Sequence, residues 1–131
     1  MLNLFQQLII DVMNRTRRLR KSEGIRRLVR ETKLSVDDFI YPLFIEEGEN
    51  IETEIVSMPG IKRFSLDRIS KELDEVVELN IPAVLLFGIP SKKDDEGIET
   101  WNDNGIMQQA IRFIKKNYPS LYVITDVCFC E

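Results

Sequence analysis

Histidine is absent from the 131 residues of this sequence, and cysteine occurs only twice, at Cys128 and Cys130. Without histidine, the chain alone cannot form a Ser-His-Asp or Cys-His catalytic group, or a metal site with histidine ligands. Two cysteines separated by one residue cannot form the disulfide framework of a small secreted domain, and free thiols are typical of a reducing compartment. The sequence therefore predicts a cytoplasmic protein.

A long apolar run is also missing. The amphipathic segment 1–13 is far too short to span a bilayer, which takes about 20 apolar residues. Its basic residues follow the apolar part, whereas a signal peptide has them in front. Two alternatives remain for this segment, packing on a neighbouring subunit or lying on a membrane surface. The first is favoured, so we expect no membrane partner.

Charge is distributed very unevenly along the chain. Residues 1–33 hold nine Lys/Arg and three Asp/Glu, or +6, and residues 34–131 hold nine and nineteen, or −10. No aromatic residue lies among the arginines of segment 15–30 for stacking on bases, and the acidic body would repel a phosphate backbone, so no nucleic-acid partner is expected. We predict a basic N-terminal arm with short helices, residues 1–34, on a body formed by residues 35–131. The arm is expected to pair with the acidic surface of a partner subunit.

The body alternates short apolar runs with amphipathic segments. Strands are predicted over 39–45, 83–87 and 121–127, and Pro42 suggests that the first is an edge strand or irregular. A helix is predicted from Ser65, as its N-cap, to about Leu79, with an apolar face formed by Leu66, Ile69, Leu73, Val76 and Val77. A second helix is predicted from Asp103 or Asn104 to a stop at Pro119.

This order of elements predicts an α/β fold with parallel strands. Two architectures are compatible with it, an open doubly wound sheet and the beginning of a (β/α)₈ barrel. The glycine-rich motifs G-x-G-x-x-G and G-x-x-x-x-G-K-[ST] are absent from the first strand–helix connection, which excludes nucleotide binding by those loops.

The residues richest in chemistry follow the third predicted strand. Asp126, Cys128 and Cys130 are two residues apart in an extended segment and therefore share one face. A Cys-x-Cys pair can offer two thiolates to a soft metal, with zinc as the first choice. Alternatively, the two cysteines are ordinary core residues and Asp126 caps the next turn. Catalytic zinc needs about three protein ligands, so a third would come from a carboxylate, another chain or sequence beyond Glu131.

Five short motifs carry a family resemblance. They are the sequence T-D-V-C-F-C-E at 125–131, R-R-L-R-K at 17–21, M-P-G at 58–60, F-G-I at 87–89, and Trp101. In their order along the chain they resemble the porphobilinogen synthase family, also called delta-aminolevulinic acid dehydratase, from about residue 15 onward. The resemblance implies a TIM (β/α)₈ barrel with an extended N-terminal arm. Because such a barrel has about 250 residues, we expect this chain to be its N-terminal part, with about three βα units, ending after the third strand.

The resemblance also implies a function. Members of the family are lyases that condense two 5-aminolevulinate molecules to porphobilinogen, with loss of water, in tetrapyrrole (heme) biosynthesis. They are homo-oligomers, typically octamers, in which the arm embraces a neighbouring subunit. Cys128 and Cys130 match two of three zinc-binding cysteines, and Asp126 matches an aspartate beside the reacting substrate.

The resemblance further implies that the third cysteine and the Schiff-base lysines lie beyond this chain. The lysines that are present, such as Lys71, Lys115 and Lys116, are expected on solvent faces, where they keep ordinary basicity. We therefore expect the isolated chain to be inactive. A non-catalytic assembly fragment and a metal-binding fragment are the alternatives.

Overall fold

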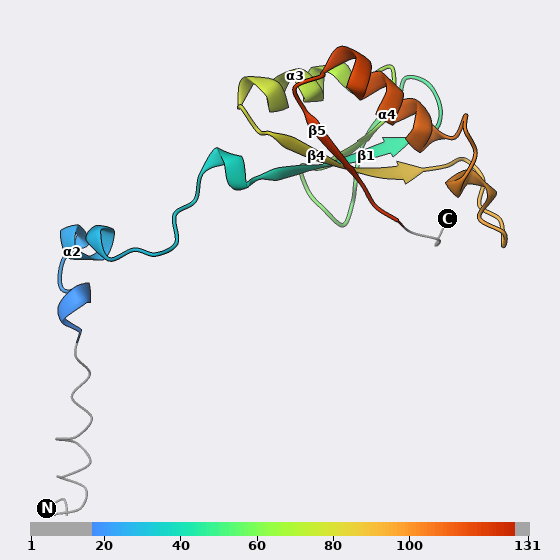
Figure 1. Cartoon of the computed structure of the whole chain (residues 1–131). Coiled ribbons are helices and arrows are strands. Elements are labelled where there is room, and N and C mark those ends of the chain that lie inside the picture. Colours follow the sequence, from blue (N-terminus) through green and yellow to red (C-terminus); the bar gives the residue numbers. More distant parts are fainter. Residues whose placement is uncertain (1–16, 128–131) are drawn as a thin grey trace, which may run out of the picture. The chain divides into compact units, whose positions relative to one another are not determined.

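The computed structural model describes residues 17–127, and the contacts within the chain divide it into two units, 1–34 and 35–131 (Figure 1). The described part of the first unit holds a 3₁₀ turn, η1 (Arg18–Arg20), and a short helix, α2 (Glu23–Leu28). The Ser22 hydroxyl caps α2 by accepting a hydrogen bond from the Ile25 N–H at 3.3 Å. Every side chain from 17 to 34 except that of Ile25 is exposed. Local capping and not a hydrophobic core therefore holds this segment in shape.

The second unit is built on a five-stranded sheet with the order β2-β3-β1-β4-β5. The strands β3, β1, β4 and β5 run parallel, and β2 is antiparallel to β3. The strand bounds are β1 (Ile40–Glu46), β2 (Glu52–Glu54), β3 (Lys62–Phe64), β4 (Ala83–Ile89) and β5 (Tyr122–Thr125). The prediction of an α/β fold with parallel strands is confirmed.

Two helices, α3 (Ser70–Glu78) and α4 (Ile106–Asn117), lie on the same side of the sheet in Figure 1. Their apolar faces and alternate residues of β1 and β4 form one buried core; its members include Leu43, Ile45, Ile69, Leu73, Val76, Val84, Leu86, Ile106, Ala110 and Ile114. Two further 3₁₀ turns, η2 (Val36–Asp38) and η3 (Ile98–Thr100), lie in the connections. None of the helices between residues 17 and 127 is long and apolar enough to cross a membrane.

The other face of the sheet carries the remaining residues of the same strands. Phe44 of β1 and Leu85 and Phe87 of β4 belong to it and are only partly buried, and Pro42 is exposed. The sheet therefore has a well-packed helical side and an apolar side that α3 and α4 do not cover.

Both predicted helices begin later than expected. The first starts at Ser70, because Ser65 is fully buried and its hydroxyl accepts a hydrogen bond from the Ile51 N–H at 2.8 Å instead of capping a helix. The second starts at Ile106 after Gly105, and neither Asp103 nor Asn104 caps it. Val77, predicted on the buried face, is 39% exposed.

The predicted strands are present with shifted ends. The first runs from 40 to 46, the second continues to Ile89, and the third is shorter than expected, from 122 to 125. The hairpin of β2 and β3 was not predicted. Pro42 does not lie in an edge strand, since β1 is inside the sheet. However, β3 pairs only with Phe44 and Ile45, so at Pro42 the strand has a neighbour on the β4 side alone.

Candidate functional site

The carboxyl ends of β1, β4 and β5 lie at one edge of the sheet because these strands are parallel, and ligand sites of α/β folds form at such edges. Near this edge Phe44 is in register with Arg63 on one side and with Phe87 on the other. The last recorded pair of β4 and β5 is Leu86 with Thr125, so the next step of the register places Asp126 beside Phe87. Arg63, Phe44, Phe87 and Asp126 thus form one row, called here the aromatic row, on the sheet face opposite to α3 and α4.

The two phenylalanines of the aromatic row are stacked. Their ring centroids are 5.0 Å apart and their planes differ by 17°. Such offset aromatic pairs add about 0.5–1.5 kcal/mol to the burial of the rings. The stack therefore forms a defined apolar wall next to the carboxylate of Asp126.

A cavity of about 640 Å³ opens at this edge. Phe44, Phe87 and Asp126 line it together with Trp101, from the connection after β4, and Met107 of α4. Its size and its mixture of aromatic, apolar and a few polar side chains are typical of small-molecule sites.

The polar groups of the cavity come from separate parts of the second unit. Lys93 and Glu99 line it from the connection after β4, and Gln108 lines it from α4. The Gln108 side-chain N–H donates to the Thr100 carbonyl at 3.2 Å, while its Oε1 is buried and accepts no hydrogen bond from the described residues. A buried acceptor of this kind fits a polar ligand or an ordered water.

Neighbouring loops at the same edge are tied together. The Ser91 N–H, after β4, donates to Glu47 Oε2, after β1, at 2.8 Å. Hydrogen bonds from Ser91 hold the pKa of the Glu47 carboxyl below its usual value. The two connections therefore share one charge-assisted contact beside the cavity.

Of the predicted site residues, the structure describes Asp126. It follows β5, is exposed and lines the cavity. Cys128 and Cys130 lie outside the described residues, so the metal site stays a prediction, and residues 17–127 hold no group of three or more side chains suited to bind a metal ion. The predicted exposure of Lys71, Lys115 and Lys116 is confirmed.

Phe44 was missed as a residue of the cavity, and Arg63, its neighbour in the register, was not singled out either. No sequence motif marks Arg63, because its place beside Phe44 depends on a hairpin of charged residues. For Phe44 the sequence did contain a signal. Phe44 stands between Leu43 and Ile45 in a strand, so its side chain lies on the opposite face of the sheet from theirs.

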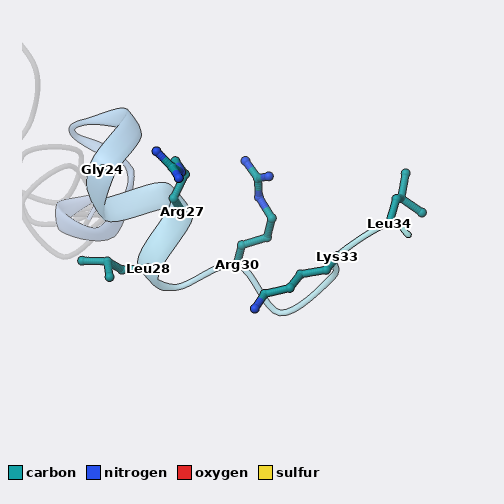
Figure 2. A pocket seen from close by; sticks show the side chains of 6 residues that line it. All are labelled: Gly24, Arg27, Leu28, Arg30, Lys33 and Leu34. Atoms are coloured by element: carbon teal, nitrogen blue, oxygen red, sulfur yellow. The ribbon is translucent and has the colours of Figure 1, made fainter. Parts of the chain in front are cut away.

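The first unit has a basic pocket of its own, of about 680 Å³. Figure 2 shows side chains standing out from α2 and from the extended segment that follows it; they are those of Arg27, Leu28, Arg30, Lys33 and Leu34, and Gly24 completes the lining. Leu28 and Leu34 are 86% and 81% exposed. The pocket thus combines three cationic side chains with two exposed leucines.

Comparison with known proteins decides the family. The profile of the delta-aminolevulinic acid dehydratase family matches residues 13–131. The chain belongs to this family. A delta-aminolevulinic acid dehydratase of Halalkalibacterium halodurans is 51% identical over 117 residues, which are 89% of this chain and 36% of the relative. The relative from Ruminiclostridium josui is 50% identical over 120 residues, 92% of this chain and 58% of the relative. This chain therefore spans between about a third and three fifths of the length of these two family members.

The fold of a delta-aminolevulinic acid dehydratase agrees with the sheet described above. The crystal structure of the enzyme from Toxoplasma gondii, in complex with the reaction product porphobilinogen, superposes with a TM-score of 0.77 and 34% sequence identity. The match covers 88% of this chain and 33% of that protein. The mixed α/β sheet is therefore similar to that part of a porphobilinogen synthase structure.

Proposed function

We propose that this chain forms part of a porphobilinogen synthase, a lyase that condenses two molecules of 5-aminolevulinate to porphobilinogen with loss of water. Membership of the delta-aminolevulinic acid dehydratase family supports the reaction. The observation that carries the proposal is Asp126, which lines an apolar cavity where the carboxyl ends of three parallel strands meet. Active sites of (β/α)₈ barrels are built at this end of the strands.

The sheet is proposed to be one part of such a barrel. In this arrangement β1, β4 and β5 are its first three strands, α3 and α4 belong to its outer layer, and residues 1–34 are an arm outside it. The apolar sheet face with Phe44 and Phe87 supports the arrangement, because side chains on the inner face of a barrel fill its interior.

The chemistry is proposed to divide between this chain and other parts of the enzyme. Asp126 is assigned a supporting role, in which its carboxylate holds or exchanges a proton of the bound substrate. A Schiff-base lysine needs a pKa lowered by burial or by a nearby cation, and every lysine of this chain is exposed. The 131-residue chain is therefore expected to be inactive on its own.

Zinc is the proposed metal. Cys128 and Cys130 would hold it, because two thiolates form a soft donor set that suits this ion, and the third ligand would be a further cysteine of the family pattern. When bound, zinc would act as a Lewis acid on the substrate.

The first unit is proposed to act in assembly. Its basic pocket, with Arg27, Arg30 and Lys33 beside exposed leucines, suits an acidic and partly apolar protein surface (Figure 2). A second copy of this chain offers such a surface, since residues 34–131 carry a net charge of −10. The proposed assembly is a homo-oligomer, an octamer by family, in the cytoplasm.

An assay of porphobilinogen formation tests the reaction. The chain would be assayed alone and together with the part of the Halalkalibacterium relative that lies beyond the matched segment. We expect product only from the mixture, and about a hundredfold lower kcat with D126N, because a group in contact with the substrate is removed.

The control variant is D95N, which makes the same change in an exposed stretch of charged residues and should leave the rate unchanged. Turnover by the chain alone would contradict the expected inactivity. A mixture in which the two parts copurify without turnover would contradict the reaction itself.

A further inference from the structure

The hairpin of β2 and β3 is attached to the rest of the sheet by a very short ladder. Only Phe44 with Arg63 and Ile45 with Phe64 are paired between β1 and β3, whereas β1 and β4 share seven pairs. Parallel ladders are slightly less stable per residue than antiparallel ones, so two pairs contribute little to the attachment of the hairpin. Side chains must therefore help to fix the hairpin. On the helical face, the buried ring of Phe64 does so.

On the opposite face of the sheet, an ion pair between Arg63 of β3 and Glu46 of β1 attaches the hairpin. Arg63 Nη1 lies 3.3 Å from Glu46 Oε2, and the two side chains are 36% and 26% exposed. Glu46 Oε2 is itself buried and accepts no geometrically good hydrogen bond from the described residues. Arg63 is therefore the charge that compensates this carboxylate, and its loss would leave a buried acceptor unpaired, which is unfavourable.

One partner of the ion pair, Arg63, is itself a member of the aromatic row. Arg63 neighbours Phe44 in the register and Phe44 stacks on Phe87. Leu86 pairs with Thr125, so the next step of the register brings Asp126 beside Phe87. Both rings and Asp126 line the cavity of about 640 Å³. Arg63 is thus one strand away from a ring that forms part of the cavity wall.

We propose that Arg63 is a positioning residue of the site, which through Glu46 fixes the Phe44–Phe87 stack beside Asp126. The role in substrate binding rests on the function proposed above. With the wall fixed, the carbon chain of the substrate is held at one place relative to the Asp126 carboxylate. With the wall loosened, binding weakens more than the chemical step, since Arg63 itself contacts neither substrate nor reacting atoms.

Lys62 provides a matched control on the same hairpin. Its Nζ lies 2.7 Å from Glu52 Oε1, so this ion pair joins β2 to β3 and does not reach β1. R63M and K62M each remove one cation of the hairpin and keep an unbranched apolar side chain. R63K keeps the charge beside Glu46, and E46Q combined with R63M removes the unpaired carboxylate if the single variant folds poorly.

Nuclear magnetic resonance of the full chain tests the structural step. In R63M, and in the double variant, we expect the ring signals of Phe44 and Phe87 to shift and broaden, because the rings lose their fixed orientation. K62M and R63K should show the ring signals of the parent chain. Unchanged ring signals in R63M, or the same change in K62M, would overturn the proposal.

Kinetics of the complemented enzyme test the step to function. R63M should raise KM for 5-aminolevulinate about tenfold with kcat changed less than about threefold, while K62M should leave both within about twofold. Equal KM values for R63M and K62M would refute the positioning role. An inactive parent mixture would instead count against the proposed function, and the ring signals would still decide the role of Arg63.

Discussion

Tyr41 illustrates how a single residue connects a strand to a helix. Its ring belongs to the helical face of β1, and its hydroxyl donates a hydrogen bond to Glu72 of α3. Burial of the ring and the neighbouring Glu72 carboxylate raise the pKa of Tyr41 to about 12. The neutral phenol is therefore the form that the folded protein favours.

The raised pKa predicts a loss of stability in alkali. In the unfolded chain Tyr41 ionises near its ordinary pKa of 10.0, and in the folded chain near 12. Its contribution is complete below pH 10 and disappears as the pH rises to 12, because the unfolded state gives up the proton first. The urea midpoint should fall more over this interval in the parent than in Y41F.

The control for Tyr41 is Y122F, which changes a tyrosine that is 68% exposed. This variant should follow the parent, since its phenol is largely exposed and its removal takes no buried group out of the fold. If Y41F loses stability between pH 10 and 12 as steeply as the parent, the assigned role of Tyr41 is wrong.

At the scale of elements, the sequence was most informative where burial follows a regular pattern. The continuous apolar runs of β1 and β4 and the three- and four-residue spacing in α3 and α4 predicted the type of these elements. The hairpin was missed because β2 reads Glu-Thr-Glu and β3 reads Lys-Arg-Phe, with no apolar alternation. These short strands form because β1 offers an edge for pairing, which is a tertiary effect.

Adjacent valines on α3 test the orientation of that helix. Val76 is 2% exposed and Val77 is 39% exposed, so the same truncation is made at an inner and an outer position. V76A should lower the free energy of unfolding by about 2 kcal/mol, because two buried methyl groups are lost and a cavity remains. V77A should change it by less than about 0.5 kcal/mol. Urea denaturation measures both, and equal losses would mean that α3 is rotated about its axis.

At the scale of the whole molecule, the site could be predicted only in part. The alternate spacing at the end of the third strand singled out Asp126, and the structure places it on the cavity, while its catalytic role stays a prediction from the family resemblance. Trp101 and Met107 join the same cavity from a loop and a helix more than ten residues earlier in the chain. These residues come together because α4 packs against the sheet. A local sequence pattern does not show where a helix will pack.

The charge division of the molecule leads to the last prediction, which concerns assembly through the basic pocket of the first unit. A triple variant, R27E, R30E and K33E, reverses the three cations that line this pocket. If these cations bind the acidic surface of a second copy, the variant should sediment as a smaller species than the parent.

About 0.5 M salt should shift the parent in the same direction, because it screens charges beyond about 4 Å. The matched control reverses three exposed lysines of the second unit, K92E, K115E and K116E, and changes the net charge equally. Sedimentation velocity distinguishes the two cases: dissociation by both triple variants would indicate general repulsion, and a parent that is monomeric at low salt would refute the role of the arm.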